Sequence, residues 1–273
     1  MHKTLRKHVC GAKKIPHAQA MPAVHAAMQR LAHSKKAALK AGFEGTATAL
    51  FAVFGGAAGA MGGDAAVGNG LLLAVLVYAT ATTSGGHLNP AVSLAVRLAT
   101  PDFTNGMCAC YIGAQILGAI VGAAIGSAII PAGIGSPAPG CFIPEIGVGV
   151  GAVFVWEFMA TFILVSTVLY AAIDNKHGGH GNAAPLAIGA SLWATASVIG
   201  PVTGAALNPA RYIAPLVAYP LSCAVPAVFS FYAYLGAHLL AAVLAAYAYR
   251  ARDWVLEHDA GEDAIAGLRE RLM

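Results

Sequence analysis

The tripeptide Asn-Pro-Ala occurs twice in this chain, at Asn89-Pro90-Ala91 and at Asn208-Pro209-Ala210. Asn is a favoured helix cap, and Pro at the first helical position needs no hydrogen-bonded N–H, so both copies predict the start of a helix. A helix that starts in the middle of membrane-spanning sequence must line a cavity. The amide N–H groups of Asn89 and Asn208 could then donate hydrogen bonds to a molecule in that cavity.

Two glutamates stand at matching positions ahead of the two tripeptides. Glu44 opens the segment Glu-Gly-Thr-Ala-Thr48 and Glu157 opens Glu-Phe-Met-Ala-Thr161, so a threonine follows each glutamate four residues later. A carboxylate inside an apolar span is costly and finds partners. We therefore expect each glutamate to accept hydrogen bonds from backbone N–H groups near the helix that starts at the tripeptide following it. The alternative for Glu44, which follows a basic stretch, is a solvated carboxylate at the membrane interface.

Arg211 follows the second tripeptide, whereas Val92 follows the first. A guanidinium stays charged and carries five donors, so Arg211 could repel cations and bind a solute. Two helix N-termini that meet would each add a partial positive charge of about half a unit, which disfavours cations and hydronium. His87 precedes the first tripeptide and is expected to line or support the cytosolic side of the cavity. The alternative is a histidine that is simply hydrogen-bonded within its loop.

Long apolar segments must carry these residues. Hydrophobic residues make up 58% of the chain and charged residues 10%, and the mean hydropathy is +0.68, which argues against a water-soluble domain. Six segments have the length that crosses about 30 Å of hydrocarbon; they are residues 42–62, 67–84, 104–130, 147–172, 184–200 and 223–250. The stretches 89–98 and 208–218 are too short to cross and are interpreted as re-entrant half-helices. The sequence thus predicts an all-α membrane protein with six transmembrane helices plus two re-entrant half-helices in an inverted 3+3 repeat, the repeats covering about 42–130 and 147–250.

Tails are expected on both sides of the apolar region 42–250. Nine of the 16 Lys and Arg residues precede Glu44 with no acidic residue among them, so residues 1–41 are predicted to be a cytosolic tail that touches anionic lipid. An organelle transit peptide is the alternative. Six crossings return residues 251–273 to the cytosolic side. The plasma membrane is the favoured location, and an internal membrane is the alternative.

The sequence shows no constellation typical of an enzyme or a metal site. The five cysteines, which lack metal-ligand spacing, are interpreted as small packing residues; they are Cys10, Cys108, Cys110, Cys141 and Cys223. Glycines recur every four residues at two places and predict close helix packing; they are Gly55, Gly59 and Gly63, and Gly118, Gly122 and Gly126. We therefore expect neither catalysis nor a bound cofactor or metal, and no nucleic acid as a partner.

The two tripeptide segments together resemble the aquaporin, or major intrinsic protein, family. The resemblance is carried by Ser84-Gly-Gly-His-Leu-Asn-Pro-Ala-Val92 and Thr203-Gly-Ala-Ala-Leu-Asn-Pro-Ala-Arg211, and it covers about residues 42–250. It implies a passive channel for water and small uncharged solutes that excludes protons and ions, assembled in the bilayer as a homotetramer with one pore per subunit. The alternative from another class is an ion-coupled secondary transporter, which also uses inverted repeats and could use Glu44 or Glu157 for coupling.

The resemblance also implies a selectivity filter of four residues near the outer mouth. Counting from the two tripeptide asparagines places it at Asn69, Ala196, Ala205 and Arg211. Asn69 could instead be a loop or interface residue on the turn Gly68-Asn-Gly70. Strictly water-selective relatives commonly have His at the position of Ala196 and a bulky aromatic at that of Asn69. The small residues here imply a wider constriction, so the alternative function is a facilitator of glycerol, urea, ammonia or hydrogen peroxide with minor water flux. However, Tyr212 stands where glycerol facilitators often have Asp.

The cytosolic loop 174–180 contains two histidines, His177 and His180, in a Gly-rich setting. Its titratable groups could form a gate that responds to pH or metal. A solvated Gly-rich turn is the alternative.

Overall fold

The computed structural model describes residues 17–60, 63–130, 139–174 and 180–272, and within them the side chains of 34–60, 63–130, 139–174, 180–219, 223 and 230–258. The chain divides into two compact units, Met1–Leu39 and Lys40–Met273. Helix α1 (His17–Ala60) begins in the first unit and ends in the second. It runs without a break through residue 41, where the sequence predicts the tail to end.

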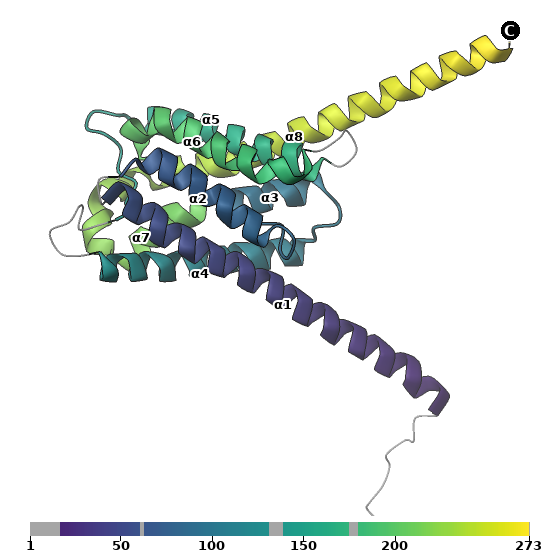
Figure 1. The fold of residues 1–273 in the computed structure, drawn as a ribbon, viewed down its shortest axis with the longest axis horizontal. Helices are drawn as coiled ribbons and strands as arrows, with labels where there is room; N and C mark the ends of the chain where they lie inside the picture. Colours follow the sequence, from purple (N-terminus) through teal and green to yellow (C-terminus); the bar gives the residue numbers. More distant parts are fainter. Residues whose placement is uncertain (1–16, 61–62, 131–138, 175–179, 273) are drawn as a thin grey trace, which may run out of the picture. The chain divides into compact units, whose positions relative to one another are not determined.

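The second unit is built from helices alone in the part that the structure describes. After α1 follow α2 (Ala65–Thr80), α3 (Pro90–Ala99), α4 (Asn105–Ile129), α5 (Val150–Val168) with a wider turn η1 (Leu169–Ile173), a short turn η2 (Gly181–Ala183), α6 (Ala184–Thr203), α7 (Pro209–Ala218) and α8 (Pro220–Leu272). Figure 1 shows the short helices α3 and α7 among the longer ones, α3 toward one end of the bundle and α7 toward the other. The predicted all-α membrane fold with two half-helices is confirmed.

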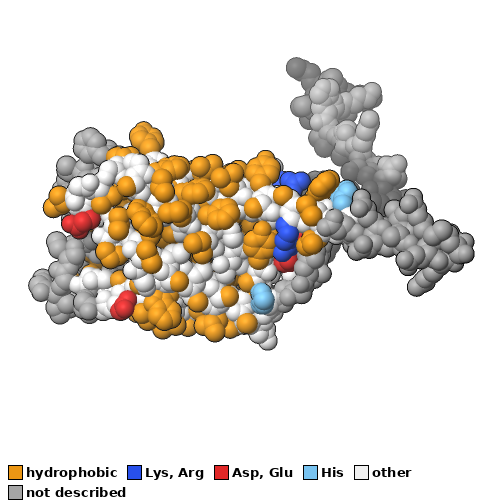
Figure 2. All heavy atoms as spheres, turned by 90° about the horizontal axis from the view of Figure 1, so that it is seen from above, with side chains coloured by type: hydrophobic (Ala, Val, Ile, Leu, Met, Phe, Trp, Pro, Cys, Tyr) orange, Lys and Arg blue, Asp and Glu red, His pale blue; other side chains and the backbone are white. Residues whose placement is uncertain are grey.

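The outer surface of the bundle is suited to hydrocarbon. Four helical stretches of the described chain are long and apolar enough to cross a membrane, namely Asn105–Ile129, Val150–Ile173, Gly181–Thr203 and Ser230–His258. On α4 the large side chains Leu117, Val121 and Ile125 face outward, while the small Ala119 and Ala123 are buried. Figure 2 shows apolar side chains over most of one face, with Lys and Arg gathered at one end. Large apolar groups outside and small ones inside are the arrangement expected of helices that pack closely in lipid.

Two glycines of α4 bring this helix against the backbone of α1. A Cβ on Gly118 would lie 2.0 Å from the carbonyl oxygen of Gly45, and one on Gly122 would lie 2.2 Å from that of Ala49. Only glycine fits such an approach, so this part of the predicted glycine packing is confirmed. A similar contact, absent from the predicted pattern, joins α2 to α6, because a Cβ on Gly189 would lie 2.4 Å from the carbonyl oxygen of Gly70.

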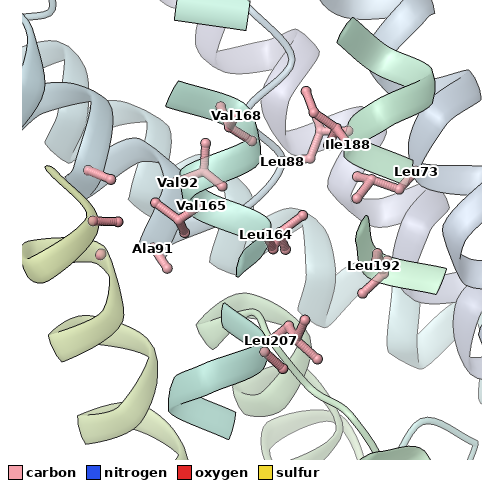
Figure 3. Close-up of a cluster of buried hydrophobic side chains, with 14 of the residues drawn as sticks. Leu73, Leu88, Ala91, Val92, Leu164, Val165, Val168, Ile188, Leu192 and Leu207 are labelled. Carbon is pink, nitrogen blue, oxygen red and sulfur yellow. The ribbon is translucent and has the colours of Figure 1, made fainter. Parts of the chain in front are cut away.

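The largest buried apolar cluster lies at the centre of the bundle, where α2, α3, α5 and α6 meet the segments that lead into α3 and α7. Figure 3 shows its side chains converging from these elements, among them Leu73, Val92, Leu164, Leu192 and Leu207. These five residues also line the central cavity described below. The core of this fold is therefore also the wall of its cavity.

Candidate functional site

The two asparagines of the tripeptides cap the two half-helices, as their sequence position predicts. The Asn89 Oδ1 atom accepts a hydrogen bond from the Ala91 N–H at 2.9 Å. The Asn208 Oδ1 atom accepts from the N–H of Ala210 at 2.9 Å and of Arg211 at 3.4 Å. The carbonyl oxygen of each amide is thus used inside its own helix end.

The same two side chains tie the halves of the protein together. The Nδ2 group of Asn89 donates to the Leu207 carbonyl at 2.9 Å, and that of Asn208 donates to the Leu88 carbonyl at 2.9 Å. Leu88 and Leu207 both have φ of 51°, in the left-handed region that L-residues avoid. This strained conformation accompanies the turn of each carbonyl toward the opposite asparagine. An amide carries two N–H donors, so one donor of each asparagine is left for the cavity.

Glu44 is fully buried and holds the segment that leads into α3. Its carboxylate accepts from the Ser84 hydroxyl at 2.6 Å, the backbone N–H of His87 at 3.0 Å and of Leu88 at 2.7 Å, and Gln115 Nε2 at 2.9 Å. The alternative of a solvated carboxylate at the interface is wrong for Glu44, because its side chain has no exposed surface.

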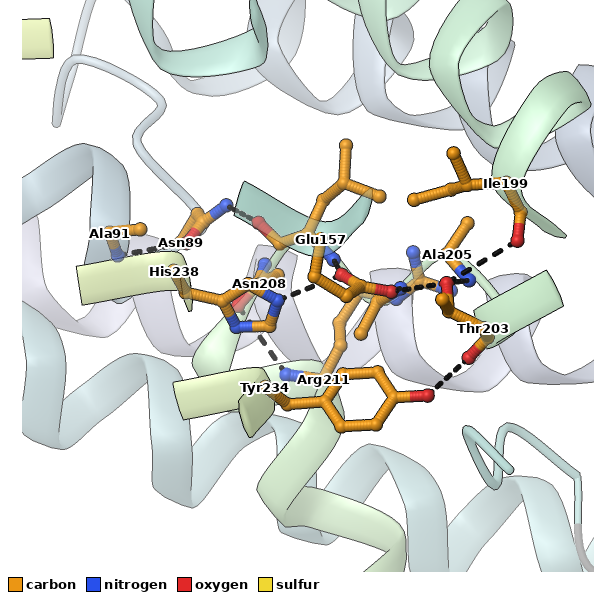
Figure 4. A network of polar contacts seen from close by, with 12 residues as sticks. Asn89, Ala91, Glu157, Ile199, Thr203, Ala205, Asn208, Arg211, Tyr234 and His238 are labelled. Carbon is orange, nitrogen blue, oxygen red and sulfur yellow. Dashed lines mark hydrogen bonds and ion pairs between the residues drawn. The ribbon is translucent and has the colours of Figure 1, made fainter. Parts of the chain in front are cut away.

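Glu157 repeats this arrangement for the segment that leads into α7. Its carboxylate binds the Thr203 hydroxyl at 2.6 Å, the backbone N–H of Ala206 at 3.0 Å and of Leu207 at 2.9 Å, and His238 Nε2 at 2.9 Å (Figure 4). The two glutamates therefore hold the two half-helix entrances through corresponding bonds.

Four partners in these networks are missing from the sequence interpretation. Tyr111 donates to the Ser84 carbonyl at 2.6 Å, and Tyr234 donates to the Thr203 carbonyl at 2.5 Å. In the sequence, Gln115 and His238 each stand four residues after one of these tyrosines, inside the last long helix of each repeat. A polar residue one helical turn after a tyrosine in two matching apolar helices is the signal that could have identified them.

A central cavity runs past both asparagines. We call it the asparagine cavity; its lining residues are Phe51, Leu73, Val77, Gly86, His87, Asn89, Val92, Leu164, Val168, Ile188, Leu192, Ala206, Leu207, Asn208 and Arg211. His87 lines it and is also held in place, because its Nδ1 atom lies 3.2 Å from the Ser93 hydroxyl and its ring packs edge-on against Phe103 and Tyr111. Most of the other lining side chains are apolar.

A second cavity brings together the four residues that the resemblance assigns to a filter. We call it the alanine cavity; it is lined by Ala65, Ala66, Asn69, Leu192, Ala196, Gly200, Gly204, Ala205 and Arg211. Leu192 and Arg211 line both cavities, so the two meet at these side chains.

Asn69 lies within α2, so the alternative that places it on a surface turn is wrong. Its side chain is 6% exposed, and its Nδ2 group donates to the carbonyls of Ala65 at 2.8 Å and Gly55 at 3.2 Å. A Cβ on Gly55 would lie 2.3 Å from Asn69 Oδ1, so glycine makes room for the amide. The Oδ1 atom accepts no hydrogen bond within the described part of the chain.

Arg211 lies in the first turn of α7, and its guanidinium is close to two aromatic rings. Its Cζ atom is 4.4 Å from the centre of the Phe51 ring and 5.3 Å from that of the Phe142 ring. Both rings present π-faces of the kind that attract a guanidinium. The sequence interpretation does not include either phenylalanine.

Of the two histidines considered for a gate, the structure describes only His180, which is not among the lining residues of either cavity. His177 lies outside the described residues. His180 is exposed, and its backbone N–H donates to the Ala171 carbonyl at 3.2 Å. Neither position adds support for gating.

The interpretation of all five cysteines as packing residues is wrong for two of them. Cys141 and Cys223 form a disulfide across 82 residues of sequence. Of the others, Cys108 is buried and Cys110 is exposed, both as free thiols, and Cys10 lies outside the described residues. The pairing was missed because it joins an interhelix loop to a helix start that are distant in sequence, and spacing alone does not reveal such a contact.

Comparisons with known proteins point to one family. The family profile described as Major intrinsic protein matches residues 30–249. The lens fiber major intrinsic protein of Gallus gallus is 38% identical over 150 residues, which are 54% of this chain and 55% of that protein. Aquaporin TIP1-1 of Arabidopsis thaliana is 39% identical over 153 residues, 56% of this chain and 59% of that protein. These matches span a little more than half of each relative. Among solved structures, the aquaglyceroporin from Plasmodium falciparum aligns with a TM-score of 0.64 and 25% identity over 77% of this chain and 93% of that one.

Proposed function

The chain belongs to the major intrinsic protein family, and we propose that it is a passive membrane channel for water and small uncharged solutes rather than an enzyme. The observation that carries this proposal is that the N-termini of the two half-helices meet in a narrow apolar cavity. Each N-terminus is capped by an asparagine whose amide has a second N–H donor beyond the one bonded to the opposite segment. The names of the relatives, aquaporins and an aquaglyceroporin, agree with it.

The asparagines give the cavity its central binding point. A water oxygen there can accept one hydrogen bond from Asn89 and one from Asn208, and an oxygen with both lone pairs occupied cannot accept a proton from a neighbour. On either side the wall is apolar, with Leu73, Val92 and Leu164 among its residues, so a molecule meets few groups that would hold it. Water passes, while a hydrogen-bonded relay of protons is interrupted.

Positive potential opposes cations at two places along this path. The N-termini of α3 and α7 each contribute a partial charge of about half a unit at the asparagines. Arg211 adds a full charge where the asparagine cavity meets the alanine cavity. Protons and cations are therefore excluded while neutral molecules are not.

The alanine cavity is the proposed selectivity filter, with Asn69, Ala196, Ala205 and Arg211 as its determining residues. Two of the four side chains are methyl groups, which leaves space for solutes larger than water. Arg211 can donate hydrogen bonds to a solute in this cavity, whereas the Asn69 Oδ1 atom is buried. Small solutes that carry a hydrogen-bond acceptor, such as glycerol, urea, ammonia and hydrogen peroxide, fit this pattern.

The topology proposed for this channel has both termini in the cytosol. Residues 1–41 and 251–273 are the proposed tails of a channel domain at 42–250, the basic N-terminal tail contacts lipid, and the plasma membrane is the favoured location. The proposed assembly is a homotetramer with one pore per subunit, as the family resemblance implies.

An ion-coupled transporter is the less favoured function. Coupling would require Glu44 or Glu157 to bind and release an ion, but each carboxylate already accepts four hydrogen bonds at 3.0 Å or less and has no exposed surface.

Stopped-flow swelling of proteoliposomes with water, glycerol, urea and ammonia in turn tests the proposal. A channel gives rapid flux that does not saturate and does not depend on ions. Saturation or coupling to an ion gradient would favour the transporter.

A further inference from the structure

The segment 139–145 crosses beside Arg211 and is attached at three points. The Tyr219 hydroxyl donates to the Pro139 carbonyl, and the Glu145 N–H donates to the Val202 carbonyl at 3.0 Å. Between these bonds lies the disulfide of Cys141 with Cys223. We call residues 139–145 the strap. It is fixed to the last turn of α6, to the end of α7 and to the start of α8.

The side chain of Phe142 projects from the middle of the strap onto the filter. Phe142 is 7% exposed, and the centre of its ring lies 5.3 Å from the Arg211 Cζ atom. A Cβ on Gly204 would lie 3.3 Å from both Phe142 Cα and Cδ1, so the residue packs directly on Gly204, which lines the alanine cavity.

Arg211 also borders a third cavity, on the strap side. Its lining includes Gly56, Gly140, Phe142, Arg211 and Tyr219. A long guanidinium side chain has several rotamers to lose on ordering. Because Arg211 lines all three cavities, its side chain has open space around it, and contact with the Phe142 ring stabilises one placement of the guanidinium over others.

We propose that Phe142 is a positioning residue that holds the Arg211 guanidinium at the wall of the alanine cavity, and that the Cys141–Cys223 disulfide fixes the strap from which Phe142 projects. The inference rests on the proposed channel function. It extends solute selection from the four filter residues to a loop side chain and the covalent link beside it.

The test compares the ratio of glycerol to water permeability in proteoliposomes of the full chain, because this ratio does not depend on how much protein folds. For Phe142→Ala we expect the ratio to rise about fivefold, the population change that a cation–π contact of ordinary strength produces. Phe142→Leu, which keeps apolar volume but has no aromatic face, should also raise it. Phe142→Tyr, which keeps the aromatic ring, should have the same ratio as the wild type.

Ile143→Ala is the matched control, since Ile143 is the next residue of the strap and is 42% exposed; its ratio should equal that of the wild type. The double variant Cys141→Ser, Cys223→Ser should raise the ratio in the same direction as Phe142→Ala, while Cys110→Ser, which removes an exposed free thiol, should not.

Two results overturn the inference in distinguishable ways. If the wild type conducts water and the glycerol-to-water permeability ratio is unchanged in both Phe142→Ala and Phe142→Leu, Phe142 does not position Arg211. The channel function is then unaffected. A wild type without flux above that of protein-free liposomes removes the channel function and the positioning role together.

Discussion

The two halves of this protein hold their half-helices through corresponding hydrogen bonds. They differ in one partner of each glutamate and in the residue that follows each tripeptide. In the first half Glu44 binds a hydroxyl, two backbone N–H groups and Gln115, and in the second Glu157 binds a hydroxyl, two backbone N–H groups and His238. After the tripeptides the halves differ more, because Val92 occupies the place that Arg211 has in the second copy. The hydrogen bonds that hold the half-helices are thus duplicated, while Arg211, the charged residue of the proposed filter, has no charged counterpart in the first half.

If the scaffold is equivalent in the two halves, removing either glutamate should have the same large effect. Glu44→Ala and Glu157→Ala each leave buried donors without an acceptor, at about 1–3 kcal/mol per group. We expect both variants to lose most of their folded yield and to unfold at much lower temperature, measured by thermal unfolding in detergent. The Gln variants, whose amide oxygen still accepts, serve as controls and should lose less. A loss confined to one half would contradict the equivalence.

The difference between the halves at the proposed filter should disappear when the residue after the second tripeptide is made the same as the residue after the first. Arg211→Val deletes a charge that, at about 8 Å and an effective dielectric constant of about 20, opposes a cation by about 2 kcal/mol. We expect cation leak to rise by about thirtyfold, which is the rate change that corresponds to about 2 kcal/mol, measured with a potential-sensitive dye in proteoliposomes. Val92→Ala in the first copy is the control and should leave the leak unchanged. If the Arg211→Val channel remains impermeable to cations, the barrier to cations lies at the half-helix termini alone.

The third residue before each asparagine provides a further contrast between the halves. Ala205 has φ of 58° and lines the alanine cavity, whereas its counterpart Gly86 has φ of 64° and would bring a Cβ within 3.0 Å of Thr80 Oγ1. Ala205→Cys should therefore fold and become sensitive to block by a mercurial, measured as loss of water flux. Gly86→Cys should reduce the folded yield instead.

The wild type sets the baseline for this experiment. Its position 205 offers no thiol, and Cys110→Ser controls for the exposed free cysteine. Equal block of the wild type and the Ala205→Cys variant would show that mercurials act elsewhere.

The smallest effect is expected from exchanging the last partners of the two glutamates. His238→Gln keeps an N–H donor for Glu157, and Gln115→His keeps one for Glu44, so each should shift the free energy of unfolding by about 1 kcal/mol or less. His238→Ala and Gln115→Ala, which remove the donor, should cost more. The measurement is the same thermal unfolding in detergent, and a large loss in His238→Gln alone would show that the imidazole has a role beyond donation.

The sequence predicted the parts of this fold that depend on local rules. The half-helix starts were placed within one residue, at Pro90 and Pro209, because asparagine caps and proline at the first position act over a few residues. Burial of the two glutamates followed from the cost of a carboxylate in an apolar span.

Contacts that depend on tertiary packing were not predictable in this way. Gln115 and His238 reach the glutamates from helices 71 and 81 residues away in sequence. The Cys141–Cys223 bond and the Phe142–Arg211 contact depend on where a loop crosses the bundle. No local sequence pattern encodes where the loop crosses the bundle. Residue spacing therefore indicates only packing for Cys141 and Cys223, and it gives no role to Phe142.

We propose that the point where the two half-helices meet passes water but not protons. The most direct test of this proposal measures osmotic water flux and proton flux in the same proteoliposomes, the second with an internal pH-sensitive dye under an imposed pH step. We expect water flux well above that of protein-free liposomes, with a low activation energy, and proton flux equal to theirs. Proton flux that rises in proportion to water flux would contradict it.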